Sequence, residues 1–352
     1  MGLQEAEAEL SSSIEPSVQP LLDAIVTTAD KDLSEAQRLF HGRGGCYPGA
    51  EHLTLDWFPP VWVLTSFQEL NPSELQLVGG ALEKQWLSML AVSDKSNKLQ
   101  NNEQLFGSEF IWVYQCRCQN NVTTTLMSGS LPEPHIVQEN GCQYLVQVGP
   151  KDSSGGRNMG LFLDMRNGRQ WIQENAKNKK VLNMFAYTCA FSVAALKGGA
   201  KEVVNIDMAK GALKLGQRNH ELNGFETGGA RFLGHNVFKT FGKLKKLGPY
   251  DIVVADPPSY QKGSFVAKKD YAKLIRRIPD LLAANYGGST GSSYALLCLN
   301  APELDTDFLK QQVAEVAPDL SFVEQLDNPP TFPAIDPERA LKVLVYEMKP
   351  KQ

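Results

Sequence analysis

The segment Asp251 to Tyr260, DIVVADPPSY, places an acid and two prolines directly after an apolar run. The run predicts a buried strand, so the Asp256 carboxylate is expected at the end of that strand. Because proline fixes φ and lacks an N–H group, the loop should be rigid and its carbonyl groups should remain free as acceptors. The Asp256 carboxylate and the Pro257 carbonyl could together accept the N–H edge of a planar base, with Tyr260 stacked on it. Asp-Pro-Pro alone is also a common turn, so the surrounding elements must decide.

Strands and helices alternate along the second half of the chain, and this alternation predicts how the loop is positioned. Short apolar runs lie at 181–185, 201–207, 230–237, 250–256, 293–300, 320–326 and 340–348. The pattern predicts an α/β fold, a mostly parallel sheet with helices on both faces. The last two runs are joined by a loop, which suggests an antiparallel hairpin. Ligands of such sheets bind beyond the carboxyl ends of the strands.

The loop after the first of these strands is FAYTCAF, Phe185 to Phe191. A dinucleotide-binding fold would carry G-x-G-x-x-G here, so that the backbone could approach a pyrophosphate. This chain has no glycine between Gly168 and Gly198. The loop therefore disfavours a pyrophosphate cofactor.

Polar side chains end the next two strands. Asp207 is placed to accept hydrogen bonds from both hydroxyls of an adenosine ribose, although an acid at this point is also a frequent helix N-cap. Asn236 could offer its amide to an adenine edge, with Val237 and Phe238 as apolar cover. The alternative for Asn236 is an ordinary turn residue.

The stretch from VLNMFAYTCAF through VVNIDMAKGALKLGQRNHELNG to DIVVADPPSY resembles the class I S-adenosylmethionine-dependent methyltransferases. It is most similar to the branch that modifies bases of bacterial large-subunit (23S) ribosomal RNA, including cytosine-C5 and guanine-N7 enzymes. The resemblance covers residues 105–352. It implies a Rossmann-like seven-stranded methyltransferase sheet with an antiparallel C-terminal hairpin, and S-adenosyl-L-methionine as cofactor.

The resemblance also implies the roles of individual residues. The cofactor would be bound at its methionine end by Phe185, Tyr187 and Thr188, at its ribose by Asp207 with Met208 beside it, and at its adenine by Asn236 and Val237. The transferred methyl group would meet Asp256, Pro257 and Tyr260 as catalytic residues, and Pro258 and Ser259 would bind substrate. Two positions depart from the family pattern: Cys189 stands where glycine is usual, and Asn236 stands where aspartate is usual.

The atom that receives the methyl group depends on whether a cysteine is available. Cytosine C5 is a poor nucleophile, so its methylation requires a thiolate that first adds to the ring. The family's cysteine corresponds to Asn300 in this chain, whereas Cys298 lies two residues deeper in the predicted strand, where packing is the simpler role. Transfer to a base nitrogen needs only alignment and acceptors. We therefore expect nitrogen methylation.

Four other functions are compatible with the sequence. They are a cytosine-C5 RNA methyltransferase that uses a cysteine, a non-catalytic RNA-binding module that retains the fold, a methyltransferase of proteins or small molecules, and, least favoured, a nicotinamide-dependent dehydrogenase.

The charge of the chain bears on its partners. With a net charge of −4 and a pI of about 5.8, the protein is not expected to coat nucleic acid nonspecifically. Two basic runs, Lys239–Lys246 and Lys268–Arg277, nevertheless flank the Asp256 loop. Such runs are often solvated surface, but Lys268 and Lys269 are candidates for contacts to RNA phosphates, with ribosomal RNA as the expected partner.

Composition predicts the organisation of the 352 residues. We expect a helical or mixed N-terminal region at 1–104, a small β-rich domain with a possible RNA-binding role at 105–168, and the methyltransferase domain at 169–352. No signal sequence, membrane span or metal site is expected, and a cytoplasmic location follows. The six cysteines should be reduced. The oligomeric state, monomer or homodimer, is left open.

Overall fold

The computed structural model describes residues 18–95, 109–118, 121–150, 158–225, 228–261, 265–285 and 291–349. Its contacts divide the chain into two compact units. Unit 1 comprises Met1–Glu139, Val146–Met159 and Pro330–Ile335, and unit 2 comprises Asn140–Leu145, Gly160–Pro329 and Asp336–Gln352. In the described residues no helix is long and apolar enough to cross a membrane.

Unit 2 contains a seven-stranded sheet in the order β10-β9-β8-β11-β14-β16-β15. The strands are β8 (Lys180–Met184), β9 (Glu202–Ile206), β10 (Ala230–Leu233), β11 (Ile252–Ala255), β14 (Ser293–Leu299), β15 (Ser321–Leu326) and β16 (Lys342–Met348). The first five strands in this order are parallel, while β16 lies antiparallel between β14 and the edge strand β15. The carboxyl ends of β10, β9, β8 and β11 therefore adjoin one another in that order.

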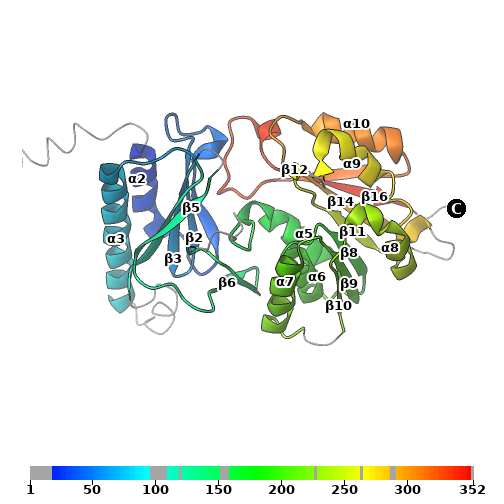
Figure 1. Ribbon diagram of the computed structural model, residues 1–352, viewed down its shortest axis with the longest axis horizontal. Helices are drawn as coiled ribbons and strands as arrows, with labels where there is room; N and C mark the ends of the chain where they lie inside the picture. Colours follow the sequence, from blue (N-terminus) through cyan, green and yellow to red (C-terminus); the bar gives the residue numbers. More distant parts are fainter. Residues whose placement is uncertain are drawn as a thin grey trace, which may run out of the picture. The chain divides into compact units, whose positions relative to one another are not determined.

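Helices cover both faces of this sheet (Figure 1). They are α5 (Arg166–Asn175), α6 (Ala190–Lys197), α7 (Lys210–Leu222), α8 (Phe241–Leu247), α9 (Ala267–Ile275) and α10 (Thr306–Val316). Single-turn helices are η3 (Leu163–Met165), η4 (Val237–Lys239), η5 (Ala283–Asn285) and η6 (Pro337–Arg339), and β12 (Tyr260–Gln261) pairs with β13 (Phe265–Val266).

Side chains alternate between the two faces of each strand, as the pleat requires. On β11, Ile252 and Val254 pack with the α5 and α6 side chains, whereas Val253 and Ala255 pack with those of α8, α9 and α10. Both faces are apolar because both are buried, which explains why the strand sequences are continuous apolar runs.

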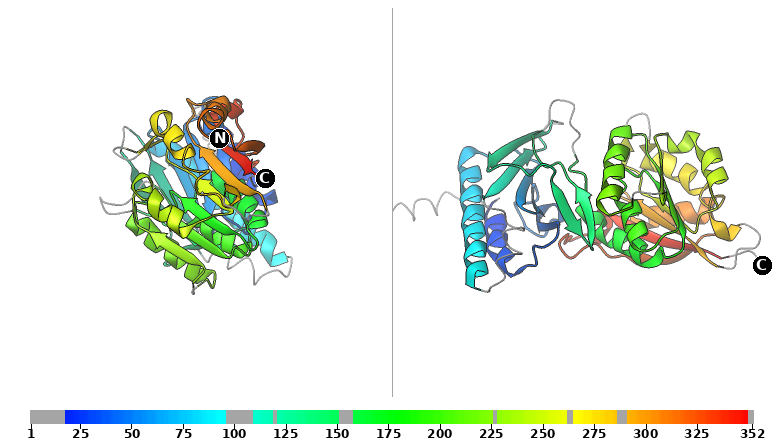
Figure 2. Two further views of the ribbon diagram at one scale, coloured as in Figure 1. Left: turned by 90° about the vertical axis from the view of Figure 1, so that its right-hand side faces the viewer. Right: turned by 90° about the horizontal axis from the view of Figure 1, so that it is seen from below.

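Unit 1 is built on a five-stranded sheet in the order β1-β2-β3-β4-β5. The strands are β1 (Gln37–His41), β2 (Leu53–Phe58), β3 (Val61–Ser66), β4 (Ile111–Cys116) and β5 (Thr123–Ser128), and the helices are α2 (Gln19–Val26), η1 (Thr27–Asp30), η2 (Gly42–Gly44) and α3 (Pro72–Lys95). Both α2 and α3 lie on one side of this sheet (Figure 2). A separate two-stranded sheet pairs β6 (Ile136–Glu139) with β7 (Cys142–Leu145).

The predicted boundary at residue 104 does not match this sheet. Strand β3 pairs in parallel with β4, so one sheet contains strands from both sides of that boundary. Residues 330–335 also belong to unit 1: the Ile335 N–H donates to the Gly44 carbonyl (2.9 Å), and a side chain on Gly44 would overlap the Pro333 carbonyl oxygen. Pairing between distant segments leaves no local pattern, which is why the sequence did not indicate it.

Two smaller expectations also need correction. Cys116 and Cys118 form a disulfide, whereas reduced thiols were expected. Helix α10, between β14 and β15, was not expected, although its N-cap is clear: the Asp305 carboxylate accepts the Phe308 N–H at 2.8 Å.

Candidate active site

The loop after β8 takes an unusual backbone path. Phe185, Tyr187 and Cys189 adopt φ values of 59°, 47° and 61°, the left-handed region that favours glycine. Such conformations cost on the order of 1–3 kcal/mol each, and they persist only when the surroundings enforce them. Here the Cys189 N–H donates to the Ala186 carbonyl at 2.7 Å, which closes the loop into a tight turn. The loop is strained and rigid.

Asp207 fixes this loop from the neighbouring strand. One carboxylate oxygen (Oδ2) accepts the Tyr187 N–H at 2.8 Å, and the other (Oδ1) accepts the Ala209 N–H at 2.7 Å. Each carboxylate oxygen can accept a further hydrogen bond. Asp207 thus accepts a backbone N–H just before α7, as a capping residue would. Its two oxygens can in addition accept hydrogen bonds from the two hydroxyls of a ribose.

Met208 and Asn236 lie together beside Asp207. The Asn236 amide (Nδ2) donates to the Met208 sulfur at 3.3 Å, and its oxygen accepts the Lys239 N–H at 3.3 Å. Met208 is 47% exposed, while Val237 is buried. The exposed apolar side chain of Met208 could cover the face of an adenine, and the carboxamide of Asn236 could hydrogen-bond to its edge. Asn236 also has the turn role that we considered as its alternative, since it caps η4.

The other predicted cofactor residues have mixed roles. The Thr188 hydroxyl donates to the Gly160 carbonyl at 2.6 Å and is buried. The Tyr187 ring lies 5.4 Å from that of Phe162, and burial raises the pKa of the Tyr187 phenol. Phe185 packs edge-on against Phe265 at 5.6 Å. Contact of Phe185, Tyr187 and Thr188 with the cofactor stays a prediction.

The Cys189 side chain points away from solvent and towards helix α7. Its side chain is fully buried and packs against α7, where a side chain on Gly216 would come within 2.5 Å of the Cys189 sulfur. Gly216 thus provides the room for a cysteine at a position where the family usually has glycine.

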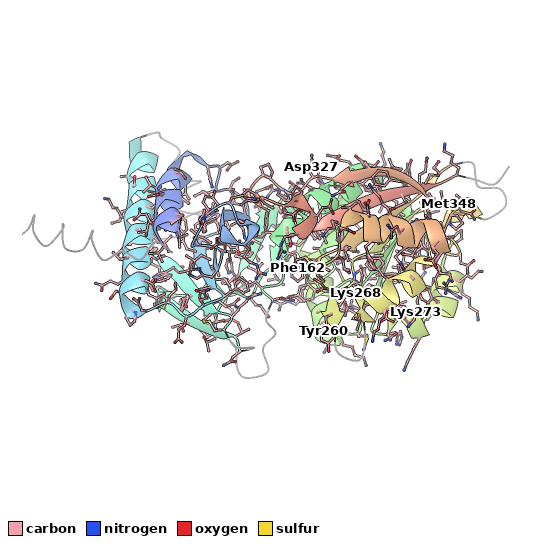
Figure 3. The ribbon with its side chains drawn as sticks, turned by 90° about the horizontal axis from the view of Figure 1, so that it is seen from above. Phe162, Tyr260, Lys268, Lys273, Asp327 and Met348 are labelled. Carbon is pink, nitrogen blue, oxygen red and sulfur yellow. A yellow bond between two sulfur atoms is a disulfide. The ribbon has the colours of Figure 1, made fainter. Side chains whose placement is uncertain are left out.

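The Asp256 loop leaves the sheet at the end of β11. Asp256, Pro258 and Ser259 are half-buried, Pro257 is buried, and Tyr260 is 67% exposed. The Ser259 carbonyl accepts the Ala267 N–H at 3.0 Å, so the loop is tied to the start of α9. This brings Tyr260 into the same part of unit 2 as Lys268 (Figure 3).

Lys268 and Lys269 are exposed in the first turn of α9. Cations at a helix N-terminus are electrostatically unfavourable. The Asp270 carboxylate offsets part of this cost, because it accepts the Val266 N–H at 2.9 Å and pairs with Lys273 at 2.8 Å. Like Lys273, Lys269 also favours the ionised form of the Asp270 carboxylate and so lowers the pKa of Asp270.

Asp256 has an unusual charge environment. Burial and the nearby Asp164 carboxylate raise the pKa of Asp256 to about 7, although the Arg169 guanidinium lowers it. Neither Asp164 nor Arg169 was among the candidate site residues chosen from the sequence. In the sequence, the two residues are only an acid followed five residues later by an arginine. Their interaction with Asp256 becomes visible only in the folded chain.

No accessible thiol is present near this loop among the described residues of unit 2. Cys298 is fully buried, and burial raises its pKa well above the ordinary value. Cys142 and Cys189 are also buried. Asn300, at the end of β14, is exposed. Within the same described residues, no cluster of three or more His, Cys, Asp or Glu could hold a metal ion.

Comparison with known proteins identifies the fold. The family model described as S-adenosylmethionine-dependent methyltransferase matches residues 37–347. The chain belongs to this family. The cofactor is therefore S-adenosylmethionine, and the side chains of Asp207, Met208 and Asn236 fit its ribose and adenine.

Curated relatives carry a more specific name. Ribosomal RNA large subunit methyltransferase I from Aeromonas salmonicida is 40% identical over 139 residues, which are 39% of this chain and 34% of that protein. The protein of the same name from Enterobacter sp. is 28% identical over 314 residues, 87% of this chain and 72% of that protein. In the first two relatives the match spans only about a third of their length.

Solved structures agree on the fold. SMU.776, a methyltransferase crystallised with SAH, superposes with a TM-score of 0.75 at 23% identity, covering 95% of this chain and 83% of that one. A SAM-dependent methyltransferase from Streptococcus mutans gives a TM-score of 0.76 at 24% identity, with 95% and 82% covered.

Proposed function

We propose that the protein transfers the methyl group of S-adenosylmethionine to a nitrogen of a base in large-subunit ribosomal RNA. The names of the curated relatives support the substrate. A ribosomal substrate would agree with the cytoplasmic location expected from the sequence.

The burial of Cys298 carries the choice of nitrogen over cytosine C5. Carbon methylation needs a thiolate in contact with the ring, and Cys298 is both fully buried and held as a thiol by its raised pKa. The Tyr271 hydroxyl also donates to the Cys298 carbonyl, which fixes this part of β14. A base nitrogen attacks the methyl group directly, so it needs no thiol.

The protein's own groups would align that attack. The cofactor supplies a methyl group made electrophilic by its sulfonium. The rigid Asp256–Pro257 pair would accept the N–H groups of the base, and Tyr260 would stack on its face. Lys268 and Lys269 would contact phosphates of the RNA. Strands β4 and β5 of unit 1 are a further candidate RNA-binding surface, in line with the RNA-binding role expected for 105–168.

Tritium transfer tests this function. Ribosomal RNA from a strain lacking the endogenous enzyme would be incubated with labelled S-adenosylmethionine and either the wild-type protein or Asp256→Ala. Label should enter RNA with the wild type and fall at least about a hundredfold with the variant. A wild type that binds S-adenosylmethionine but labels no RNA would favour the non-catalytic RNA-binding alternative.

A further inference from the structure

The backbone around Thr188 is the most constrained part of the loop after β8. Tyr187 and Cys189, on either side of Thr188, both have positive φ, 47° and 61°. The peptide group that follows Thr188 is held at both ends. Its N–H, which belongs to Cys189, donates to the Ala186 carbonyl at 2.7 Å. Its carbonyl accepts the side-chain amide (Nδ2) of Asn219 at 3.0 Å. Strained backbone persists only where such contacts enforce it.

Asn219 is a fully buried residue of α7 whose carboxamide has a partner on each side. Its oxygen accepts the N–H of Leu145, the last residue of β7, at 2.8 Å, while its amide donates to the Thr188 carbonyl. Because a backbone N–H can only donate and a carbonyl can only accept, these two partners fix the orientation of the carboxamide. Asparagine is unfavourable inside a helix, so α7 itself gains no stability from this residue.

The next residue of α7, His220, connects this helix to the strands that precede the cofactor-binding segments. Its Nδ1–H donates to the Gly216 carbonyl at 2.6 Å, so its Nε2 accepts the Ser192 hydroxyl at 2.8 Å. The Ser192 oxygen accepts the amide of Asn205 on β9, and the Asn205 oxygen accepts the amide of Asn183 on β8, both at 3.0 Å. All four of these side chains are buried. The chain of hydrogen bonds therefore fixes α7 relative to β8 and β9.

We propose that Asn219 is a positioning residue for S-adenosylmethionine, which acts through the Thr188 carbonyl and holds the loop Phe185–Cys189 in the conformation that receives the methionine end of the cofactor. The inference rests on the proposed function only for its use of S-adenosylmethionine, not for the RNA target or the methylated atom. Since Asn219 is fully buried, a ligand bound over the loop does not touch it.

The physical effect of Asn219 is to order the loop before the cofactor arrives. Without the amide donor, the Thr188 carbonyl loses a buried hydrogen bond, and the peptide group can turn to relieve the positive φ of its neighbours. The cofactor would then have to order the loop on binding, which lowers its affinity.

Two matched substitutions on α7 test this role. Asn219→Asp keeps an oxygen for the Leu145 N–H but loses the donor to the Thr188 carbonyl. Asn223→Asp, one turn later, is the control: the Asn223 oxygen accepts the Gln143 N–H at 2.9 Å, and its amide donates to the Gln143 carbonyl at 2.8 Å. Both variants add one negative charge and remove an amide donor to a backbone carbonyl, but only the first removes a bond to the cofactor loop.

A neutral pair of variants guards against misfolding caused by a buried carboxylate. Asn219→Ala compared with Asn223→Ala removes the same two amide donors without adding charge. Urea unfolding identifies the variants that remain folded and measures the stability that each has lost.

Calorimetry with two ligands separates positioning of the loop from a general loss of stability. Either folded Asn219 variant should bind S-adenosylmethionine at least about tenfold more weakly than wild type, since a buried hydrogen bond is lost. Adenosine, which lacks the methionine part, should bind within about twofold of wild type. The Asn223 variants should bind both ligands as wild type does.

Three results would overturn the inference: unchanged affinity of a folded Asn219 variant for S-adenosylmethionine, equal losses for S-adenosylmethionine and adenosine, or the same loss in the matched Asn223 variant. These measurements contain no RNA. A wild type that binds the cofactor but labels no RNA would contradict the proposed function, while the binding comparison would still decide the role of Asn219.

Discussion

At the scale of single residues, Asp256 and Asp207 are both acids at strand ends, yet their surroundings assign them different roles. Asp207 is tied by two backbone N–H groups and carries the predicted ribose contacts. Asp256 is desolvated beside another carboxylate, which makes its ionised form unfavourable. Sequence reasoning chose both residues from their positions after strands, but it could not foresee this difference.

The raised pKa of Asp256 predicts a pH-dependent cost in stability. The folded protein binds this proton more tightly than the unfolded chain, so the stability it contributes is complete below about pH 4 and is lost as the pH rises towards 7. Asp256→Asn has no such loss. Its stability relative to wild type should therefore increase between pH 4 and pH 8, by up to about 4 kcal/mol. Urea unfolding at several pH values measures this, and a constant difference would contradict the assigned pKa.

Asp207 allows a second prediction. In Asp207→Asn, one oxygen becomes an NH₂ group, so one of the two backbone donors, from Tyr187 or Ala209, loses its acceptor. We expect S-adenosylmethionine to bind at least about tenfold more weakly by calorimetry, since both the loop and the ribose contact are disturbed. Met208→Ala, which removes only apolar cover, should have a smaller effect. Unchanged affinity in Asp207→Asn would exclude the ribose role.

At the scale of elements, the β8–α6 loop and helix α7 are matched to each other. Cys189 occupies a left-handed conformation and fills the space that Gly216 leaves open on α7. The departure from the family pattern that was noted in the sequence is thus compensated by a residue 27 positions later.

This match predicts a rescue. Gly216→Ala should destabilise the protein by about 1–3 kcal/mol, because its methyl group would overlap the Cys189 side chain. Adding Cys189→Gly should restore most of the loss, since glycine removes the overlap and suits the positive φ. Gly211→Ala, on the same helix with open space around it, is the control and should stabilise by up to about 1 kcal/mol. Thermal unfolding of these three variants and of Cys189→Gly alone measures the coupling, and an additive double variant would refute it.

Elements with local patterns were predicted well, whereas long-range relations were not. The strands β9, β10, β11, β14, β15 and β16 lie within their expected ranges, and β8 is displaced from its range by one residue, because each is a distinct apolar run. The pairing of β3 with β4, the placement of 330–335 in unit 1 and the Asp164–Asp256 interaction join distant segments. Periodicity and turn residues report only on neighbours along the chain, so these features required the folded structure.

At the scale of the whole molecule, the net charge is unfavourable for binding RNA, whereas the local charge near the Asp256 loop favours it. The chain is acidic overall, with a net charge of −4, yet Lys268 and Lys269 are exposed near the Asp256 loop. An RNA partner would meet this local patch, because contacts to phosphates are made within a Debye length of about 8–10 Å.

A charge-matched pair of variants tests the patch. Lys268→Glu with Lys269→Glu should weaken RNA binding at least about tenfold and reduce its salt dependence, since two phosphate contacts are lost. Lys214→Glu with Arg218→Glu, exposed on α7, changes the net charge equally and should have little effect. Fluorescence titrations at several salt concentrations measure this, and equal losses in both variants would show that only net charge matters.

The central claim is transfer of a methyl group to a base nitrogen of large-subunit ribosomal RNA. Mass spectrometry of nucleosides, after reaction of the protein with this RNA and S-adenosylmethionine, tests the claim most directly. We predict one new N-methylated nucleoside, absent with Asp256→Ala. The appearance of 5-methylcytidine instead would contradict the account, because it would require a thiolate nucleophile that the buried Cys298 cannot provide.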